Sequence, residues 1–170
     1  VRFLRANAGL YGIDSARFGA VGFSAGAHLS MMLGVTDPAD NLEGIETWTH
    51  AGNAVDTANQ SSKVQAVVSF FGPTDFTQSN LPVVTEPLVR DFLGGSVDQV
   101  RQVAIQASPI THLDSKDAPM LLLQGTKDFL VPYDQAFLMA QEMTEVGVPG
   151  RVEFIVGAGH GWGGAERQRT

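Results

Sequence analysis

Four short apolar runs alternate with stretches of helical character along this chain of 170 residues. The runs are RFGAVGF (17–23), KVQAVVSFFG (63–72), APMLLLQG (118–125) and RVEFIV (151–156). Buried parallel strands read as continuous apolar runs, and parallel strands need a crossover connection between them, which is usually a helix. The alternation therefore predicts an α/β fold, with a mainly parallel sheet of about four strands flanked by helices.

The segments between these runs carry helix start and stop signals. Gly12 ends an amphipathic opening segment, Ser96 with Gln99 forms a capping-box signature, and Pro132 suits a first helical position. The predicted helices cover 1–11, 25–33, 86–95, 96–106 and 132–147.

The stretch 36–63 differs from the rest because it is polar and has no periodicity. It predicts a long surface loop or a lid-like insertion. The chain length suits one domain with a sizeable core, so we expect residues 1–170 to form a single α/β domain.

The motif GFSAG (22–26) places Ser24 where the first apolar run gives way to a helical segment. A chance match is easy in a chain with 19 glycines, so the value of the motif depends on its partners. A serine hydroxyl is a weak nucleophile until a base takes its proton, and the base needs a third group that orients it. The backbone N–H of Ala25, at the helix start, would be one donor to an oxyanion.

Candidate partners follow the later strands. Asp128 lies four residues after Gln124, and His160 lies four residues after Val156. In an open parallel sheet, ligands bind beyond the carboxyl ends of the strands, so these side chains are expected at one edge together with Ser24. The arrangement predicts nucleophilic catalysis with Ser24 as nucleophile, His160 as base and Asp128 as the orienting acid.

Each of these residues also has a structural interpretation. Ser24 can be a serine without catalytic function at a strand-to-helix junction. His160 can have a packing role only, and the Asp128 side chain can hydrogen-bond to the backbone of its own turn. Asp75, in FFGPTDF after the second strand, is the rival acid, although Gly-Pro-Thr-Asp is also a common turn or helix cap. His28 falls among packed apolar residues and is interpreted as structural.

Other side chains carry less information about a site. His50 lies in the polar insertion and His112 in a helix-to-strand loop, so neither has a strand-end position. Trp48, Phe129 and Trp162 are as compatible with packing as with lining a pocket, and the substrate-binding residues are left unassigned.

Charge and composition exclude several classes of protein. The net charge is −7, the pI is near 4.9 and Lys and Arg form no cluster, which argues against a nucleic-acid partner. No apolar run approaches the roughly 18 to 20 residues of a membrane span. Cysteine is absent and the four histidines lack ligand spacing, so no metal or other cofactor is expected. The composition is compatible with any compartment. Because no signal-peptide pattern is visible at the start of this sequence, the cytoplasm is the default expectation.

Several stretches together resemble the α/β-hydrolase superfamily, and within it the bacterial carboxylesterases of the hormone-sensitive-lipase-like and feruloyl-esterase-like groups. They are VRFLRANAGLYGIDSARFGAVGFSAGAHLS, VQAVVSFFGPTDF, QASPITHL, MLLLQGTKDFLVPYDQ and GAGHGW, in the family's order. The resemblance implies a Ser-Asp-His triad at Ser24, Asp128 and His160. It also implies hydrolysis of small carboxylic esters with a short or aromatic acyl group.

By this resemblance the chain corresponds to the C-terminal half of the hydrolase fold. The loop that supplies the family's second oxyanion donor would then lie outside this sequence. The first strand would be an exposed sheet edge, so we expect a homo-oligomer, for example a symmetric dimer. Two alternatives stay open: a catalytically silent or impaired oligomeric module, and a serine peptidase of the prolyl-oligopeptidase kind.

Overall fold

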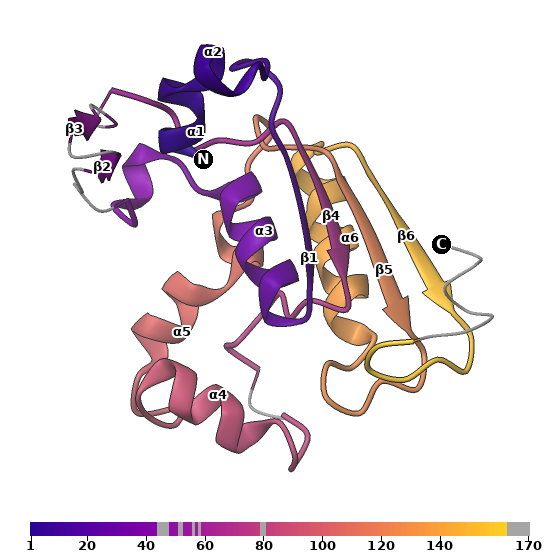
Figure 1. Ribbon diagram of the computed structural model, residues 1–170. Helices are drawn as coiled ribbons and strands as arrows, with labels where there is room; N and C mark the ends of the chain where they lie inside the picture. Colours follow the sequence, from indigo (N-terminus) through magenta and orange to yellow (C-terminus); the bar gives the residue numbers. More distant parts are fainter. Residues whose placement is uncertain (44–47, 51–52, 56, 58, 79–80, 163–170) are drawn as a thin grey trace.

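The four predicted strands form one parallel sheet in the order β1-β4-β5-β6 (Figure 1). The computed structural model describes residues 1–43, 48–50, 53–55, 57, 59–78 and 81–162. This arrangement confirms the α/β fold that the alternating pattern predicts. The strands are β1 (Gly19–Phe23), β4 (Ala66–Phe70), β5 (Met120–Gly125) and β6 (Gly150–Ile155).

Two long helices cover one face of the sheet. Helix α3 (Ala25–Val35) and helix α6 (Asp134–Val146) contribute Met31 and Met139, which are fully buried against Val67 and Leu122 of the strands. The opposite side chains of β4 and β5 pack with Phe71 and Trp162 in a second, smaller apolar cluster. The alternation of side chains along each strand thus separates a large core from a small one.

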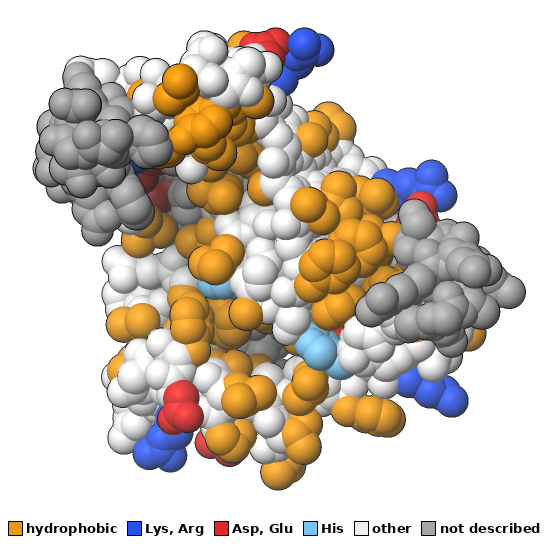
Figure 2. Space-filling view, viewed as in Figure 1, with side chains coloured by type: hydrophobic (Ala, Val, Ile, Leu, Met, Phe, Trp, Pro, Cys, Tyr) orange, Lys and Arg blue, Asp and Glu red, His pale blue; other side chains and the backbone are white. Residues whose placement is uncertain are grey.

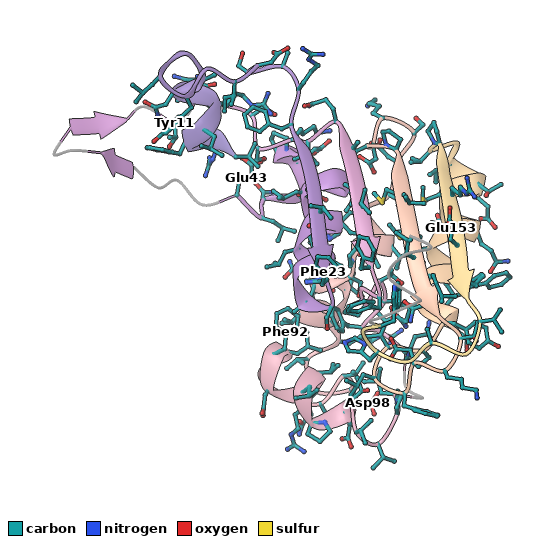
Figure 3. The ribbon with its side chains drawn as sticks, turned by 45° about the vertical axis from the view of Figure 1, so that its right-hand side comes forward. Tyr11, Phe23, Glu43, Phe92, Asp98 and Glu153 are labelled. Carbon is teal, nitrogen blue, oxygen red and sulfur yellow. The ribbon has the colours of Figure 1, made fainter. Side chains whose placement is uncertain are left out.

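Helices α4 (Glu86–Leu93) and α5 (Arg101–Ala107) lie near the carboxyl ends of the strands. Helix α4 and helix α5 lie there with Phe92, whereas Tyr11 and Glu43 lie at the opposite end (Figures 1 and 3). A third apolar cluster, formed by Phe76, Val89 and Leu93 with their neighbours, packs α4 and α5 against the segment that follows β4. The short 3-10 helix η2 (Pro109–His112) follows α5 and contacts α3.

The predicted opening helix is instead two short helices, α1 (Arg2–Ala6) and α2 (Ala8–Tyr11). Asn7 breaks the helix, because its amide donates a 2.8 Å hydrogen bond to the carbonyl oxygen of Phe3 while its backbone leaves the helical region. Asparagine competes with helical hydrogen bonding in this way. The predicted stop is confirmed, since Gly12 has a φ of 63°.

Two helix starts were predicted too early. The side chain of Gln99 accepts a 3.2 Å hydrogen bond from the backbone N–H of Ser96, but this contact closes a turn and α5 begins only at Arg101. Helix α6 begins at Asp134, two residues after Pro132. In both cases the signal residues are present and a turn precedes the helix.

The polar stretch 36–63 has more regular structure than predicted. It contains the 3-10 helix η1 (Pro38–Asp40) and an antiparallel pair of strands, β2 (Trp48–His50) and β3 (Asn53–Val55). Strands of three residues are too short to show an alternating pattern, which explains why the sequence predicts only a loop. The lid-like role stays a prediction.

Candidate active site

Ser24 occupies the turn between β1 and α3 with φ 53° and ψ −120°, a conformation that non-glycine residues rarely adopt. Its backbone N–H donates a 2.9 Å hydrogen bond to the carbonyl oxygen of Phe70, which ties the turn to the end of β4. The turn therefore holds the half-buried Ser24 side chain at the carboxyl edge of the sheet.

His160 reaches Ser24 from the loop after β6. The Nε2 atom of His160 lies 2.8 Å from Oγ of Ser24, and the ring packs edge-on to Phe71 with a centroid distance of 4.8 Å. Phe71 itself has a φ of 46°, so the chain after β4 also leaves the extended conformation where it meets the histidine. The ring of His160 is thereby fixed with one nitrogen toward the serine.

Asp128 holds the other ring nitrogen. Its Oδ2 atom lies 2.8 Å from Nδ1 of His160, and its side chain is completely buried. Its Oδ1 atom accepts hydrogen bonds from the backbone N–H groups of Leu130 and Val131, and the amide of Gln124 donates to Oδ2. These three donors fix the orientation of the carboxylate, as a buried charge requires.

The three side chains form a continuous hydrogen-bonded line. An ionised carboxylate only accepts hydrogen bonds, so Nδ1 of His160 donates to Asp128 and Nε2 is left to accept the Ser24 hydroxyl proton. This tautomer is the one in which a histidine can act as a base toward a serine.

The structure places the rival acid elsewhere. Asp75 accepts hydrogen bonds from the backbone and hydroxyl of Thr77 and from the amide of Gln78, so its carboxylate holds a local turn. Gln135 of α6 fixes the same turn by accepting from the backbone N–H groups of Thr74 and Asp75. The carboxylate that contacts His160 is that of Asp128.

Ala25 opens α3 directly after Ser24. The first N–H groups of a helix have no carbonyl four residues earlier within it, so they are free to face an anion. This position agrees with the predicted oxyanion donor.

A cavity of about 240 Å³ adjoins Ser24 and His160. Hydrophobic side chains surround a hollow at this end of the molecule in the space-filling view (Figure 2). The walls come from α3, α4, the turn after β4 and the loop between β5 and α6. The apolar lining residues include Phe76, Leu81, Leu88, Val89, Phe92 and Leu130.

The three other histidines are not part of the hydrogen-bonded line formed by Ser24, His160 and Asp128. His28 is buried, as predicted, and it also lines the cavity. His112 bonds to Asp40 and to the carbonyl oxygen of Gln106. The side chain of His50 lies outside the described part of the chain.

Of the three aromatic candidates, Phe129 and Trp162 do not line the cavity. Phe129 is 77% exposed, and Trp162 packs on Phe70 and Phe71. The side chain of Trp48 lies outside the description. The sequence analysis missed the cavity walls because they come from four separate segments. It also missed Gln124, for which a polar residue inside the apolar run LLLQG is the available signal.

Within the described ranges, no helix has the length and apolar character needed to cross a membrane. The same ranges contain no group of three His, Asp or Glu side chains suited to a metal ion.

The parallel sheet and the serine held at a strand-to-helix turn define the α/β-hydrolase class. Residues 1–143 match the BD-FAE family, to which the chain belongs. The esterase LipC of Mycobacterium tuberculosis is 29% identical over 180 residues, covering 100% of this chain and 41% of LipC.

Solved structures of esterases also resemble this chain over nearly its whole length. A thermophilic esterase of the planctomycete Thermogutta terrifontis, with propionate bound, is 26% identical with a TM-score of 0.73 and covers 99% of this chain and 57% of its own. A truncated carbohydrate esterase from gut microbiota is 27% identical with a TM-score of 0.71, covering 94% of this chain and 57% of its own. The chain thus spans about two fifths of LipC and somewhat over half of these structures.

Proposed function

We propose that this chain hydrolyses carboxylic esters by a serine mechanism, with Ser24 as the nucleophile. The observation that carries the proposal is the pair of 2.8 Å contacts that join Ser24, His160 and Asp128 in one line. The φ of 53° at Ser24 supports it, because strained backbone of this kind is concentrated at functional sites.

The proposed reaction has two halves. Oγ of Ser24 attacks the ester carbonyl carbon while Nε2 of His160 takes the hydroxyl proton, and the N–H of Ala25 stabilises the oxyanion. The bond to the alcohol oxygen then breaks, and His160 returns the proton to the leaving alcohol. Water attacks the resulting acyl-serine by the same proton transfers and releases the carboxylic acid. Asp128 keeps the imidazole oriented and stabilises its charged form.

The relatives favour an ester over a peptide as substrate. LipC is named as an esterase, and the Thermogutta terrifontis esterase holds propionate, a short carboxylate. An apolar cavity of about 240 Å³ beside Ser24 is compatible with a small apolar substituent of an ester.

Labelling with a fluorophosphonate probe tests the proposal. The probe forms a covalent bond with an activated serine, so peptide mass spectrometry is expected to find the adduct on Ser24. The Ser24→Ala variant removes the target. Ser30→Ala is the matched control, because Ser30 lies on the same helix with its hydroxyl bonded to the carbonyl oxygen of Gly26. Absence of the adduct from the folded wild-type chain would contradict the proposal and favour a silent module.

A further inference from the structure

Among the described residues, one ring nitrogen of His28, the Nδ1 atom, has no hydrogen-bond partner. His28 lies one helical turn after Ser24, and its Nε2 atom is 2.7 Å from the carbonyl oxygen of Ala107 in α5. A carbonyl oxygen only accepts hydrogen bonds, so Nε2 carries the proton and Nδ1 keeps its lone pair. Burial lowers the pKa of His28 and so favours this neutral ring.

His28 lines the cavity with only a small part of its surface exposed. His28 is only 5% exposed, and Phe76 and Phe92 pack against its ring with centroid distances of 5.1 and 5.6 Å. In the part of the chain that the structure describes, Nδ1 makes no hydrogen bond, and no side-chain nitrogen or oxygen is both sealed from solvent and unpaired. An unpaired Nδ1 that is not sealed must keep some contact with solvent, and since His28 lines the cavity we infer that this contact is made there.

The other polar side chains in the cavity wall are already engaged. The hydroxyl of Thr85 donates to the carbonyl oxygen of Leu130, and the carboxylate of Asp75 accepts from Thr77 and Gln78. The Oε1 atom of Gln135 accepts from two backbone N–H groups. Nδ1 of His28 is therefore an acceptor in apolar surroundings that a ligand can satisfy, and an unmade hydrogen bond there costs free energy.

We propose that His28 determines substrate specificity by accepting a hydrogen bond from the substituent that fills the cavity. The substrate class is then an ester in which one apolar substituent carries a hydroxyl or N–H donor. This inference rests on the proposed function for the reaction at Ser24, but it concerns a different atom and can be measured without turnover.

Nitrogen-15 spectra of histidine-labelled protein test the contact directly. Titration with benzyl alcohol is expected to shift the Nδ1 resonance of His28, because its hydroxyl donates to that nitrogen. Toluene has the same apolar body without a donor, and it is expected to leave that resonance in place. Equal responses to the two compounds, or no response to either, would overturn the inference.

Kinetic measurements on matched pairs of esters test whether the contact with His28 produces a substrate preference. The pairs are methyl phenylacetate and benzyl acetate, each compared with its para-hydroxymethyl derivative, so that the donor lies on the acyl side or on the alcohol side. In one pair the wild-type kcat/KM is expected to be about tenfold higher for the hydroxymethyl compound, as one hydrogen bond provides. A ratio near one in both pairs would overturn the inference.

Two substitutions separate recognition from structure. His28→Gln keeps a donor near the Nε2 position for Ala107 but has no acceptor at the Nδ1 position, so the preference is expected to disappear. His28→Asn keeps an acceptor near the Nδ1 position and loses the contact with Ala107, so the preference is expected to remain while stability falls. Loss of the preference in His28→Asn but not in His28→Gln would contradict the assignment.

His112→Gln is the matched control. His112 bonds through Nε2 to the neighbouring carbonyl oxygen of Gln106 at 2.9 Å but does not line the cavity, so the substrate preference should be unchanged. Hydrolysis of para-nitrophenyl acetate separates the two proposals. If wild type and Ser24→Ala hydrolyse it equally, the proposed function fails, and the nitrogen-15 titration still decides whether His28 binds a donor.

Discussion

Gly22 and Gly26 approach each other so closely across the Ser24 turn that a Cβ on Gly22 would lie 2.1 Å from the carbonyl oxygen of Gly26. The atoms it would meet belong to the backbone of α3, which cannot move without unwinding the helix start. The first glycine of the motif is therefore required by the close approach of strand and helix.

Gly22→Ala is expected to lower the free energy of unfolding by about 2 to 3 kcal/mol, because the added methyl overpacks the turn. Gly26→Ala is the control, since nothing lies within 4 Å of its added Cβ and alanine favours a helix by roughly 0.5 to 1 kcal/mol. Urea unfolding of the two variants measures the difference. Equal losses of stability would show that the clash does not matter.

Asp128→Asn is expected to reduce kcat on the order of 10³- to 10⁴-fold, because an amide at this position no longer holds the required histidine tautomer. Asp75→Asn is expected to change kcat less than about tenfold, since its carboxylate bonds to Thr77 and Gln78. Steady-state hydrolysis of para-nitrophenyl acetate by both variants makes the comparison. A larger loss at Asp75 would identify it as the acid.

The pH dependence of stability is expected to carry the signature of Asp117. Burial raises the pKa of this carboxyl to about 6 from the ordinary value of 3.8, and the charge of Asp114 adds to the shift. The folded chain therefore holds a proton that the unfolded chain releases earlier, so stability falls as the pH rises from 3.8 to about 6 and then levels.

Asp117→Asn should remove this decline. The variant is expected to gain about 3 kcal/mol above the raised pKa and nothing below 3.8, because only the ionised form is penalised. Thermal unfolding across this range measures the gain. An identical pH profile for variant and wild type would mean that Asp117 is not strained when charged.

Self-association is expected through β1, which forms one edge of the described sheet. Its side chains Val21 and Phe23 are 64% and 59% exposed, and exposed apolar strands at an edge pair readily with another chain. Val21→Lys should shift the chain toward monomer, as measured by sedimentation velocity. If the wild-type chain sediments as a monomer at every concentration, this expectation is wrong.

Local signals in the sequence are sufficient to predict the four strands of the parallel sheet and the positions of Ser24, Asp128 and His160 near strand ends. Each depends on a short stretch: an apolar run, a glycine-flanked serine, or a polar residue a few positions after a strand. The contacts that join these residues were inferred only from the rule that parallel strands end at one edge.

Other features depend on contacts between distant segments and could not be predicted. The cavity next to Ser24 needs walls from α4 and from the loop before α6, and the free nitrogen of His28 follows from the position of Ala107. Whether Asp75 or Asp128 meets His160 also depends on loop conformation, because both carboxylates follow strands. Each of these features is a three-dimensional distance, which residue spacing does not contain.

The hydrogen bond between Ser24 and His160 joins residues 136 positions apart, from the two outer strands of the sheet. Forming such a distant contact requires closing a long loop, and chains dominated by such contacts fold slowly. The side-chain line comes together only after β1 and β6 have both been added to the sheet. Recovery of Ser24 labelling during refolding would therefore report when both outer strands have joined the sheet.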